Sequence, residues 1–571
     1  MSATSQAPTT TRREALDAAA GRLKEAARLF AERPIGARVA LARAMLAGAG
    51  RLAERMVAEA CASKGIAPGT PPAGEEWLAS PYTTHRILRQ TVSSLVALER
   101  SGNTRIGRVR RMADGQLAVQ VFPADRLDAL VFAGLSGEVH LTPGGDEDLH
   151  EPERASFYRG RHHEGRVCLV LGAGNVNSIP AADVVAKLFN EGKVCLLKMN
   201  PVNAYLGPLL EEAFAEAIAG GVLAIVYGGA EEGSYLAHHP AVDEVHITGS
   251  DRTHDLLVWG PPGPERAERM ARGTPLLEKE VTSELGNVTP ILVVPGPFTP
   301  RELAYQADSV AGMVTHNASF NCIAGKMLVL PRGWPHRQRF LDLVLAAMAL
   351  TPPRRAWYPG AAERYERLTR GRPDVHRLGG GGEDTLPFTL VGGLRAEDPE
   401  EIAYRMEAFC PLLFATELGS ADPLEFLSEA TRFANERLWG TLSAALVASE
   451  RTLADEVTSG AVEQAIRRLR YGSVCVNVWP GVAYSSGTGP WGAFPGAPLT
   501  DIQSGRGFVH NTLMLERVEK LVMRGPSRSL VKLPYFPSHR TAHELSRRLA
   551  YLELDGRKMR LPGIILSALR A

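Results

Sequence analysis

From residue 166 onward, short apolar segments alternate with amphipathic helical segments, and this alternation limits the fold more than any other feature of the chain. RVCLVLG, KVCLLKM and VLAIVYGG have the length and apolar content of buried strands, and a helical pattern separates each from the next. A second series begins at TPILVV (289–294) and continues through a helix near 300–315, the strand KMLVL and a helix over 336–350. Apolar strands that alternate with helices form βαβ units on a parallel sheet, so we predict an α/β fold.

The chain length and the pattern before residue 166 predict further parts. With 571 residues, the chain is too long for a single core. Residues 12–65 and 83–100 have the spacing of helices. Residues 104–165 have the composition of short strands and turns, as in GQLAVQVFPA, ALVFAGLSGEVHLTP and ASFYRGRHHEGR. We therefore expect an N-terminal helical region and a short β-rich part before the α/β lobes.

Composition and charge argue against several classes of function. The net charge is +1, and no basic tract carries interleaved aromatic residues, which argues against a nucleic acid partner. No segment reaches the ~18 apolar residues of a membrane-spanning helix, and we find no apolar signal-peptide region. The six cysteines include no CxxC pair, which argues against a disulfide framework or a structural zinc site. We predict a soluble, cytoplasmic protein without a metal.

Cys322 is the strongest candidate for a reactive group. It lies in THNASFNCIAGK (315–326), in the predicted turn between a helix and the strand KMLVL. Free cysteines are among the most commonly buried residues, so a structural thiol is the alternative to a nucleophile. His316 could activate a thiol, but it lies in the same turn beside Asn317, and we expect it to form part of a wall.

Other segments place polar residues at predicted strand ends. LGAGNVNSIP (171–180) has two of the glycines of a dinucleotide-binding turn, but Asn177 stands where the third would be. The same turn places Asn175 at the carboxyl end of a strand, where α/β sheets bind ligands. The next strand ends in Lys198, and ITGS (247–250) forms another strand end that suits a phosphate group.

Glu284, in TSELGNVTP (282–290), precedes a glycine and a strand. A single glutamate in a loop is usually a solvated surface residue. Beside a reactive thiol, its carboxylate could instead activate a water molecule as a general base.

The order of these signals resembles that of the aldehyde dehydrogenase superfamily. SELGN is similar to the family's Glu-Leu-Gly-Gly segment, and Asn317 and Cys322 have its Asn-x4-Cys spacing. EAFCPLLFA (407–415) is similar to its Glu-x-Phe-Gly-Pro segment, and GPWGAF (489–494) to its Pro-Phe-Gly segment. The resemblance covers roughly residues 165–480 and identifies the chain as a divergent member.

The resemblance implies a covalent mechanism with three catalytic residues. Cys322 would attack the carbonyl carbon of an aldehyde, and the Asn175 amide with the Cys322 backbone N–H would form the oxyanion hole. After hydride transfer to the nicotinamide of NAD or NADP, Glu284 would activate the water that hydrolyses the thioester. The attack step requires a lowered pKa of the thiol.

The resemblance also implies a set of cofactor-binding residues. Lys198 would contact the adenosine ribose, and Gly249 and Ser250 would line the pyrophosphate region. Glu407 would hold the nicotinamide ribose, and Phe409 would pack near it.

Several substitutions depart from the family pattern, mainly around the cofactor. Asn287 replaces the second glycine after Glu-Leu, His254 replaces a glycine of the cofactor-binding helix, and Cys410 replaces the glycine of Phe-Gly-Pro. Pro201 stands where many members have a glutamate three residues after the cofactor lysine. The choice between NAD and NADP therefore stays open.

The implied architecture is a Rossmann-like parallel-sheet cofactor domain, an α/β catalytic domain and a small β oligomerisation arm. The expected boundaries are residues 1–134 and 166–281 for the N-terminal helical region and cofactor domain, 282–480 for the catalytic domain, 135–165 and 505–530 for the arm, and 531–571 for a C-terminal extension. The family implies a homodimer or homotetramer.

The predicted function is NAD(P)-dependent oxidation of an aldehyde to a carboxylic acid. An acyl-CoA or acyl-thioester reductase, which runs the same thioester chemistry backwards, is the alternative among enzymes. A catalytically silent relative that serves as a scaffold is the alternative from another class, because a fold does not guarantee a function.

Overall fold

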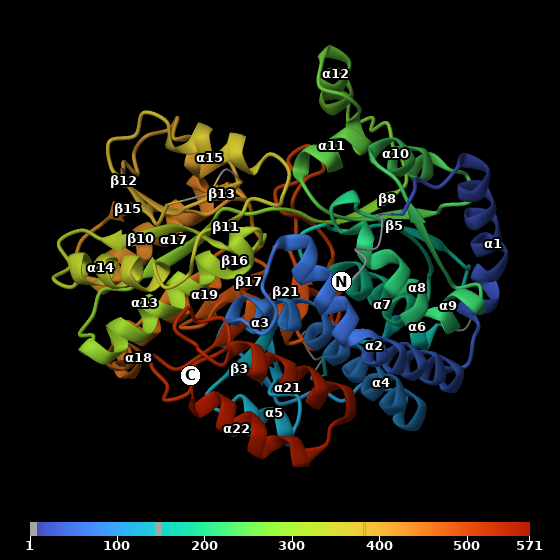
Figure 1. The fold of residues 1–571 in the computed structure, drawn as a ribbon, viewed down its shortest axis with the longest axis horizontal. Coiled ribbons are helices and arrows are strands. Elements are labelled where there is room, and N and C mark those ends of the chain that lie inside the picture. Colours follow the sequence, from blue (N-terminus) through green and yellow to red (C-terminus); the bar gives the residue numbers. More distant parts are fainter. Residues whose placement is uncertain (1–7, 143–150, 161–162, 381, 383, 571) are drawn as a thin grey trace.

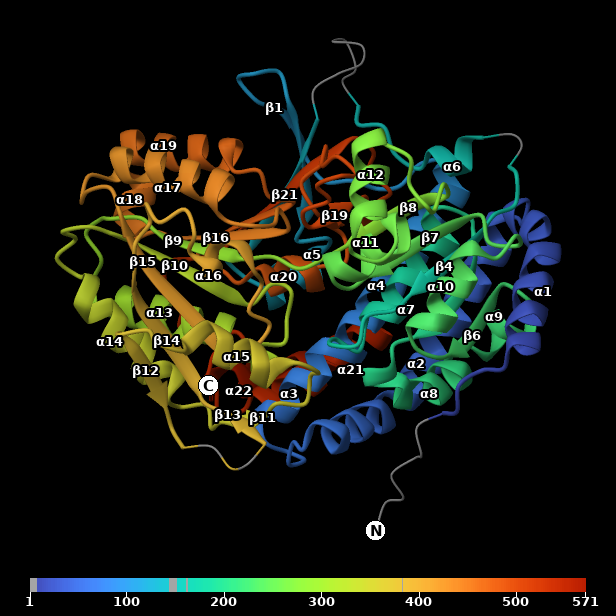
Figure 2. The same ribbon diagram turned by 90° about the horizontal axis from the view of Figure 1, so that it is seen from above.

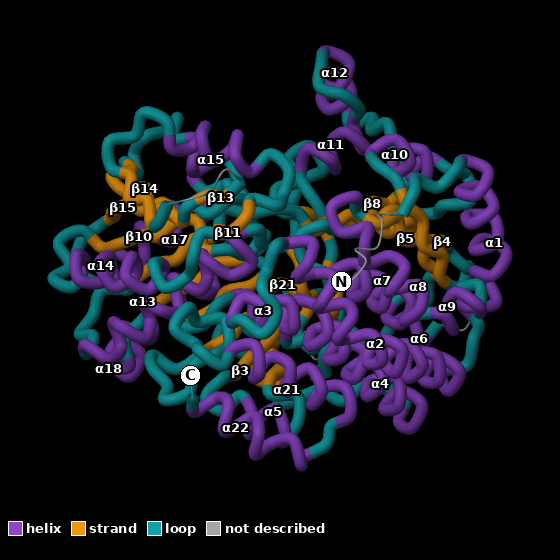
Figure 3. The backbone as a smooth tube through the Cα atoms, viewed as in Figure 1, coloured by secondary structure: helices purple, strands orange, loops and turns teal. Residues whose placement is uncertain are grey.

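The computed structural model describes residues 8–142, 151–160, 163–380, 382 and 384–570, and two large sheets dominate it. Figure 3 shows the strands gathered into two regions with helices around both. One sheet has six strands and the other has eleven. The predicted α/β class is confirmed.

The six-stranded sheet contains the first predicted series, in the order β19-β8-β7-β4-β5-β6. Five of its strands are parallel, and β19 (Gly505–Arg506) is antiparallel to its neighbour. The parallel strands are β4 (Val167–Leu171), β5 (Val194–Met199), β6 (Leu223–Tyr227), β7 (Glu244–Thr248) and β8 (Glu280–Glu284). All residues of β4, β5 and β7 are buried, as expected for strands covered on both faces.

Helices connect these strands where the sequence predicts them. The helices are α7 (Ile179–Val185), α8 (Gly207–Ala213), α10 (Ala230–His238) and α11 (Asp251–Trp259). The helix α12 (Pro264–Arg272) follows α11 and projects from the molecule in Figure 1, within the segment 258–275.

The eleven-stranded sheet has the order β1-β2-β3-β21-β17-β16-β9-β10-β15-β14-β12. Its central strands from β21 to β14 run parallel to one another. They are β21 (Val518–Arg524), β17 (Ser473–Val476), β16 (Ser443–Val447), β9 (Thr289–Val293), β10 (Gly325–Pro331), β15 (Leu412–Leu418) and β14 (Phe388–Leu394). At one edge, β12 (Val375–Leu378) is antiparallel to β14. The predicted helices of this lobe are α13 (Pro300–Thr315) and α14 (Arg337–Met348).

The predicted arm contributes strands to this same sheet. β3 (Ser136–Leu141) pairs antiparallel with β21 and with β2 (Leu117–Phe122), which pairs in turn with β1 (Val109–Arg111). Part of the predicted arm, residues 143–150 and 161–162, lies outside the described residues. Its role in oligomerisation, like the domain boundaries, stays a prediction.

The N-terminal region differs from the sequence prediction in detail. The single helical region expected over residues 12–65 is two helices, α1 (Arg13–Ala31) and α2 (Ile35–Lys64). Pro34 separates them, because proline has no N–H and keeps the preceding residue out of the helical region. The helices α3 (Pro71–Trp77) and α4 (Thr83–Ser101) follow.

Two short segments predicted as strands or turns are helical. ALVF was expected in a strand, but its first part belongs to α5 (Arg126–Val131), because Asp125 caps that helix by accepting hydrogen bonds from the backbone N–H groups of Leu127 and Asp128. ASFYRGRHHEGR contains α6 (Ser156–Arg159).

The C-terminal part adds a small helical layer. The helices α21 (Ala542–Asp555) and α22 (Leu561–Leu569) pack on each other, and α21 also contacts α3 and α4. Figures 1 and 2 both show these two helices, in red, beside the blue N-terminal helices. Among the described residues, no helix is both long and apolar enough to cross a membrane.

Candidate active site

Cys322 lies in a turn between α13 and β10, and the backbone that leads to it is strained. Asn317, Ala318 and Ser319 have φ angles of 56°, 53° and 68°, in the left-handed region. Such conformations cost on the order of 1–3 kcal/mol each when the residue is not glycine, and they persist where the surroundings enforce them. The turn as predicted is therefore confirmed, and it is held in an unusual shape.

Residues from the N-terminal helices hold this turn. Lys64 Nζ, at the end of α2, donates a hydrogen bond to Asn317 Oδ1 at 3.0 Å. Glu75 Oε2, on α3, accepts one from the backbone N–H of Asn317 at 2.8 Å. Lys64 also forms a buried ion pair with Glu76 at 2.8 Å. The first strained residue thus has partners on both its side chain and its backbone.

Two cavities meet at Cys322. Five of the six cysteines are buried, whereas Cys322 is partly exposed. It lines a wide cleft of about 1210 Å³ and also a narrow cavity of about 90 Å³. A thiol in this position can contact molecules that arrive from two sides.

The wide cleft brings together all of the predicted site residues. Leu171, Lys198, Thr248 and Glu284 reach it from the carboxyl ends of β4, β5, β7 and β8. Parallel α/β sheets bind ligands at this edge. The predicted residues that line the cleft are Asn175, Lys198, Gly249, Ser250, Glu284, Cys322, Glu407 and Phe409.

Asn175 is held close to the strained turn. Its side-chain Nδ2 donates a hydrogen bond to the carbonyl oxygen of Phe320 at 3.1 Å. Its own carbonyl oxygen accepts a hydrogen bond from Asn317 Nδ2 at 3.0 Å. A side-chain amide has two N–H donors, so one remains for a ligand in the cleft.

Glu284 is a buried carboxylate at the end of β8, with a side chain that is 6% exposed. Its Oε1 has no hydrogen-bond partner among the described residues, which is unusual for a buried charged group. Burial, and then the nearby charge of Asp183, raise the pKa of Glu284 well above its ordinary value. A buried carboxyl group beside a reactive thiol is a candidate for proton transfer.

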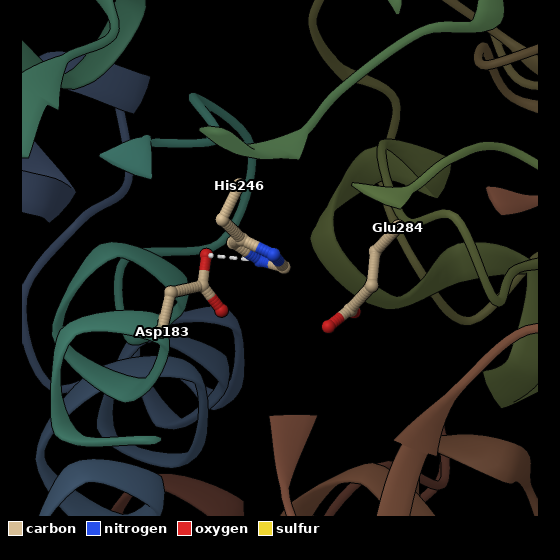
Figure 4. A group of neighbouring side chains, drawn as sticks. All are labelled: Asp183, His246 and Glu284. Atoms are coloured by element: carbon tan, nitrogen blue, oxygen red, sulfur yellow. Dashed lines mark ion pairs between the residues drawn. The ribbon is translucent and has the colours of Figure 1, made fainter. Parts of the chain in front are cut away.

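Asp183 and His246 lie beside Glu284, as Figure 4 shows. The His246 Nε2 atom is 3.6 Å from Asp183 Oδ2, and its Nδ1 atom forms a hydrogen bond with Thr282 Oγ1 at 2.9 Å. The three groups are close enough to one another to share a cation. The sequence analysis did not identify Asp183 or His246, because each lies alone in an apolar segment.

Lys198 and the start of α11 form the part of the cleft beside the six-stranded sheet. Lys198 Nζ donates hydrogen bonds to the carbonyl oxygens of Gly228 and Gly229 at 2.9 and 3.1 Å, and burial lowers its pKa to about 8. Ser250 is the N-cap of α11, and its Oγ accepts a hydrogen bond from the backbone N–H of Thr253 at 3.2 Å. A cation near a helix N-terminus suits a phosphate-containing ligand.

Glu407 and Phe409 lie across the cleft, in the segment before β15 of the eleven-stranded sheet. Glu407 Oε1 accepts a hydrogen bond from the backbone N–H of Asn287 at 3.2 Å, and burial raises the pKa of Glu407 to about 7. A Cβ atom on Gly286 would lie 2.1 Å from Glu407 Oε2, so only glycine allows this approach. The Phe409 ring packs on Tyr358 with the ring centroids 4.7 Å apart.

These residues fit a nicotinamide dinucleotide. The cleft offers a lysine and a helix N-terminus for phosphate and ribose groups at one end and a carboxylate and an aromatic ring at the other. Asn287 and His254, which depart from the family pattern, are buried beneath this surface and do not line the cleft.

The thiol of Cys322 has a pKa above its ordinary value. Burial is the main cause, and the carboxylates of Glu407 and Glu284 act in the same direction. This direction is opposite to the lowered pKa that the attack step requires.

The narrow cavity lies on the other side of Cys322, and its lining is mostly apolar and aromatic. Its wall includes His316, as predicted from the sequence, and the His316 ring packs at a tilt against Trp479 with the ring centroids 4.7 Å apart. The other lining residues come from several distant segments, including residues 78–83, 479–486 and 533–549. The sequence analysis missed them because no motif connects these segments.

Comparisons with known proteins concern the fold and one segment of the sequence. No family model matches the chain. The 4-trimethylaminobutyraldehyde dehydrogenase A of Danio rerio is 32% identical over 160 residues, which are 28% of this chain and 27% of that protein. The chain thus matches about a quarter of the length of this relative.

Solved structures match over nearly the whole chain. The γ-glutamyl-γ-aminobutyraldehyde dehydrogenase from Burkholderia cenocepacia J2315 has a TM-score of 0.59 at 20% identity, covering 90% of this chain and 89% of that one. The NADP-dependent glyceraldehyde-3-phosphate dehydrogenase from Bacillus halodurans C-125 has a TM-score of 0.59 at 17% identity, with 90% and 92% covered. Together, the comparisons show that the chain has the fold of these aldehyde dehydrogenases and shares a sequence segment with the Danio rerio enzyme.

Proposed function

We propose that the protein oxidises an aldehyde to a carboxylic acid with NAD or NADP, through a thioester on Cys322. The observation that carries this proposal is the position of Cys322, where a wide cleft that fits a dinucleotide meets a narrow apolar cavity. Asn175 and Glu284 line the same cleft, so a nucleophile, an oxyanion donor and a base share one space.

The first step forms a covalent adduct. The Cys322 thiol releases its proton to solvent water, and its sulfur bonds to the carbonyl carbon, so the π electrons of the carbonyl group move to its oxygen, which becomes an oxyanion. The free N–H of the Asn175 amide and the Cys322 backbone N–H stabilise that oxyanion. One such donor is worth about 2.7–4 kcal/mol in the transition state.

The remaining steps release the acid. The residues of the wide cleft would hold a nicotinamide cofactor, which would supply the acceptor for the hydride of the substrate carbon. Loss of this hydride leaves a thioester on Cys322, and Glu284 takes a proton from the water that attacks it. Cleavage of the carbon–sulfur bond then frees the carboxylic acid and returns the thiol.

An acyl-thioester reductase is the second candidate, and one observation favours it. Burial and Asp183 keep the Glu284 carboxyl group protonated to a higher pH than usual, and a protonated carboxyl group cannot accept a proton from water. Slow hydrolysis would leave the thioester available to a thiol such as that of coenzyme A.

The test is nicotinamide absorbance during incubation with NAD or NADP and a panel of aliphatic and aromatic aldehydes, beside a Cys322→Ala variant. We expect cofactor reduction in the wild type and none in the variant. Oxidation of reduced cofactor by acyl-CoA, with no aldehyde oxidised, would replace the dehydrogenase by the reductase. If the protein neither reduces NAD or NADP with an aldehyde nor oxidises the reduced cofactor with acyl-CoA, and binds neither dinucleotide, a scaffold role would be favoured.

We further propose, as the sequence predicts, that the protein is cytoplasmic and that it forms a homodimer or homotetramer. Size-exclusion chromatography with light scattering measures the second point directly.

A further inference from the structure

We propose that the C-terminal segment, residues 531–569, closes the substrate side of the active site and restricts it to aldehydes with a compact apolar substituent of roughly four carbon atoms. This inference rests on the proposed function. It assigns a role to a part of the chain that lies beyond the motifs of the site.

The C-terminal segment forms part of the narrow cavity's wall. Leu533, Pro534 and Tyr535 line the cavity from the loop before α21, and Leu549 lines it from α21 itself. Cys322 lines the same cavity, so a substituent on the carbon bonded to its sulfur would point toward these residues.

Most polar groups of the wall are already engaged within the protein. The Tyr535 hydroxyl forms a hydrogen bond with Ser309 Oγ at 2.8 Å, and the Tyr484 hydroxyl forms one with Ser178 Oγ at 2.9 Å. The Trp479 indole N–H donates to the carbonyl oxygen of Ile323 at 3.0 Å. The His316 Nε2 atom differs, since it has no partner among the described residues. A ligand is thus offered mainly apolar surface, which favours a hydrocarbon substituent.

The volume of the cavity sets the size of that substituent. A cavity of about 150 Å³ can hold benzene, with its six carbons. The narrow cavity has about 90 Å³, which by the same ratio holds roughly four carbon atoms. Leu533 and Leu549 belong to the wall that would limit a longer chain.

The chain is built to bring the C-terminal segment this close. A Cβ atom on Gly312, in α13, would lie 2.4 Å from the carbonyl oxygen of Tyr535, and one on Gly74, in α3, would lie 2.7 Å from the carbonyl carbon of Ala542. At both points where the C-terminal segment crosses a helix, the helix has a glycine, and a larger residue would not leave room for the backbone of the segment.

Buried ion pairs fix the other end of α21. Glu553 Oε1 accepts a hydrogen bond from Arg86 at 2.7 Å, and Glu553 Oε2 accepts one from Arg89 at 2.8 Å. Arg86 also pairs with Asp128 at 2.6 Å. The segment is therefore a fixed wall, with its position set by contacts to three other parts of the fold.

The test compares two leucines on the same helix. Leu549 and Leu545 are one helical turn apart on α21 and are both 4% exposed, but only Leu549 lines the cavity. Because one methylene group changes specificity by roughly 10–200-fold, Leu549→Ala should raise kcat/KM for octanal relative to butanal by at least about tenfold. Leu545→Ala should lower stability by a similar amount and leave this ratio unchanged. The same octanal-to-butanal ratio of kcat/KM in the wild type, Leu549→Ala and Leu545→Ala would overturn the proposal.

A variant that fills the narrow cavity, and a readout that does not depend on turnover, serve as controls for this test. Leu533→Phe should shift the preference toward shorter aldehydes, and it creates no cavity that could unfold the protein. Labelling of Cys322 by N-methyl- and N-octyl-iodoacetamide, followed by mass spectrometry, reports access to the cavity without turnover. The octyl-to-methyl labelling ratio should rise in Leu549→Ala and stay unchanged in Leu545→Ala.

The two readouts separate this proposal from the proposed function. If no aldehyde is oxidised but the labelling ratio shifts, the dehydrogenase is wrong and the role of the C-terminal segment holds. If aldehydes are oxidised but neither the kcat/KM ratio nor the labelling ratio shifts, the proposed function holds and the C-terminal segment does not limit the substrate.

Discussion

The two cavities that meet at Cys322 differ in size, in lining and in how the chain builds them. The wide cleft is formed at the ends of consecutive strands and carries lysine, serine and glutamate side chains. The narrow cavity is mostly apolar and combines segments from the beginning, middle and end of the sequence. The comparison suggests that a common cofactor is bound by the regular part of the fold and a particular substrate by its irregular additions.

Among variants that test the separate roles of the two cavities, Glu284→Gln is expected to have the largest effect on turnover. Glu284 lines the wide cleft and not the narrow cavity. Loss of a general base typically costs about 10²–10⁴-fold, so steady-state turnover should fall by that factor while the first turnover is retained. Rapid-quench kinetics and the intact mass of the acyl-enzyme measure the two steps. The aldehyde length preference should not change, and a changed preference would break the separation of the two sides.

A pH series on Cys322 tests how strongly the two sides influence the shared thiol. Because the pKa of Cys322 is raised, its thiolate is scarce at pH 7, and alkylation by iodoacetamide should accelerate by about tenfold per pH unit from pH 7 to 9. Glu407→Gln removes one of the charges that raise this pKa and should accelerate labelling at pH 7. A labelling rate that is already constant above pH 7 would show an activated thiol instead. Quantitative mass spectrometry supplies the rates.

The smallest effect concerns Lys198, which lines only the wide cleft. Its pKa is lowered to about 8, so the ammonium group is charged at pH 7 and loses its proton as the pH rises through 8. Dinucleotide affinity should therefore weaken by a few-fold between pH 7 and 9, measured by titration calorimetry. Lys198→Met should bind more weakly at pH 7 and lack this pH dependence. An identical dependence in the variant would assign it to another group.

The strands of both parallel series could be predicted because nearly all of their residues are apolar and buried. The segment RVCLVLG became β4, TPILVV became β9 and KMLVL became β10. The candidate residues of the wide cleft could also be predicted from the sequence, since strand ends and short motifs place them at one edge of the sheet. Their catalytic and binding roles are still predictions.

The narrow cavity could not be predicted, for a physical reason. Leu78, Trp479 and Leu549 are ordinary apolar residues, and only the packing of α21 against the N-terminal helices brings them together. The ion pair of Arg86 with Glu553 joins residues 467 positions apart, and no local pattern records such a pair. The raised pKa of Cys322 likewise depends on burial and on carboxylates from two other segments.

The strained turn before Cys322 has a consequence for how the protein is made. Its partners Lys64 and Glu75 are synthesised long before it, and N-terminal parts generally fold first during synthesis, so the turn can be held as soon as it emerges from the ribosome. The wall at Leu549 emerges more than two hundred residues later. The residues that complete the apolar cavity beside Cys322 are therefore among the last of the chain to be synthesised.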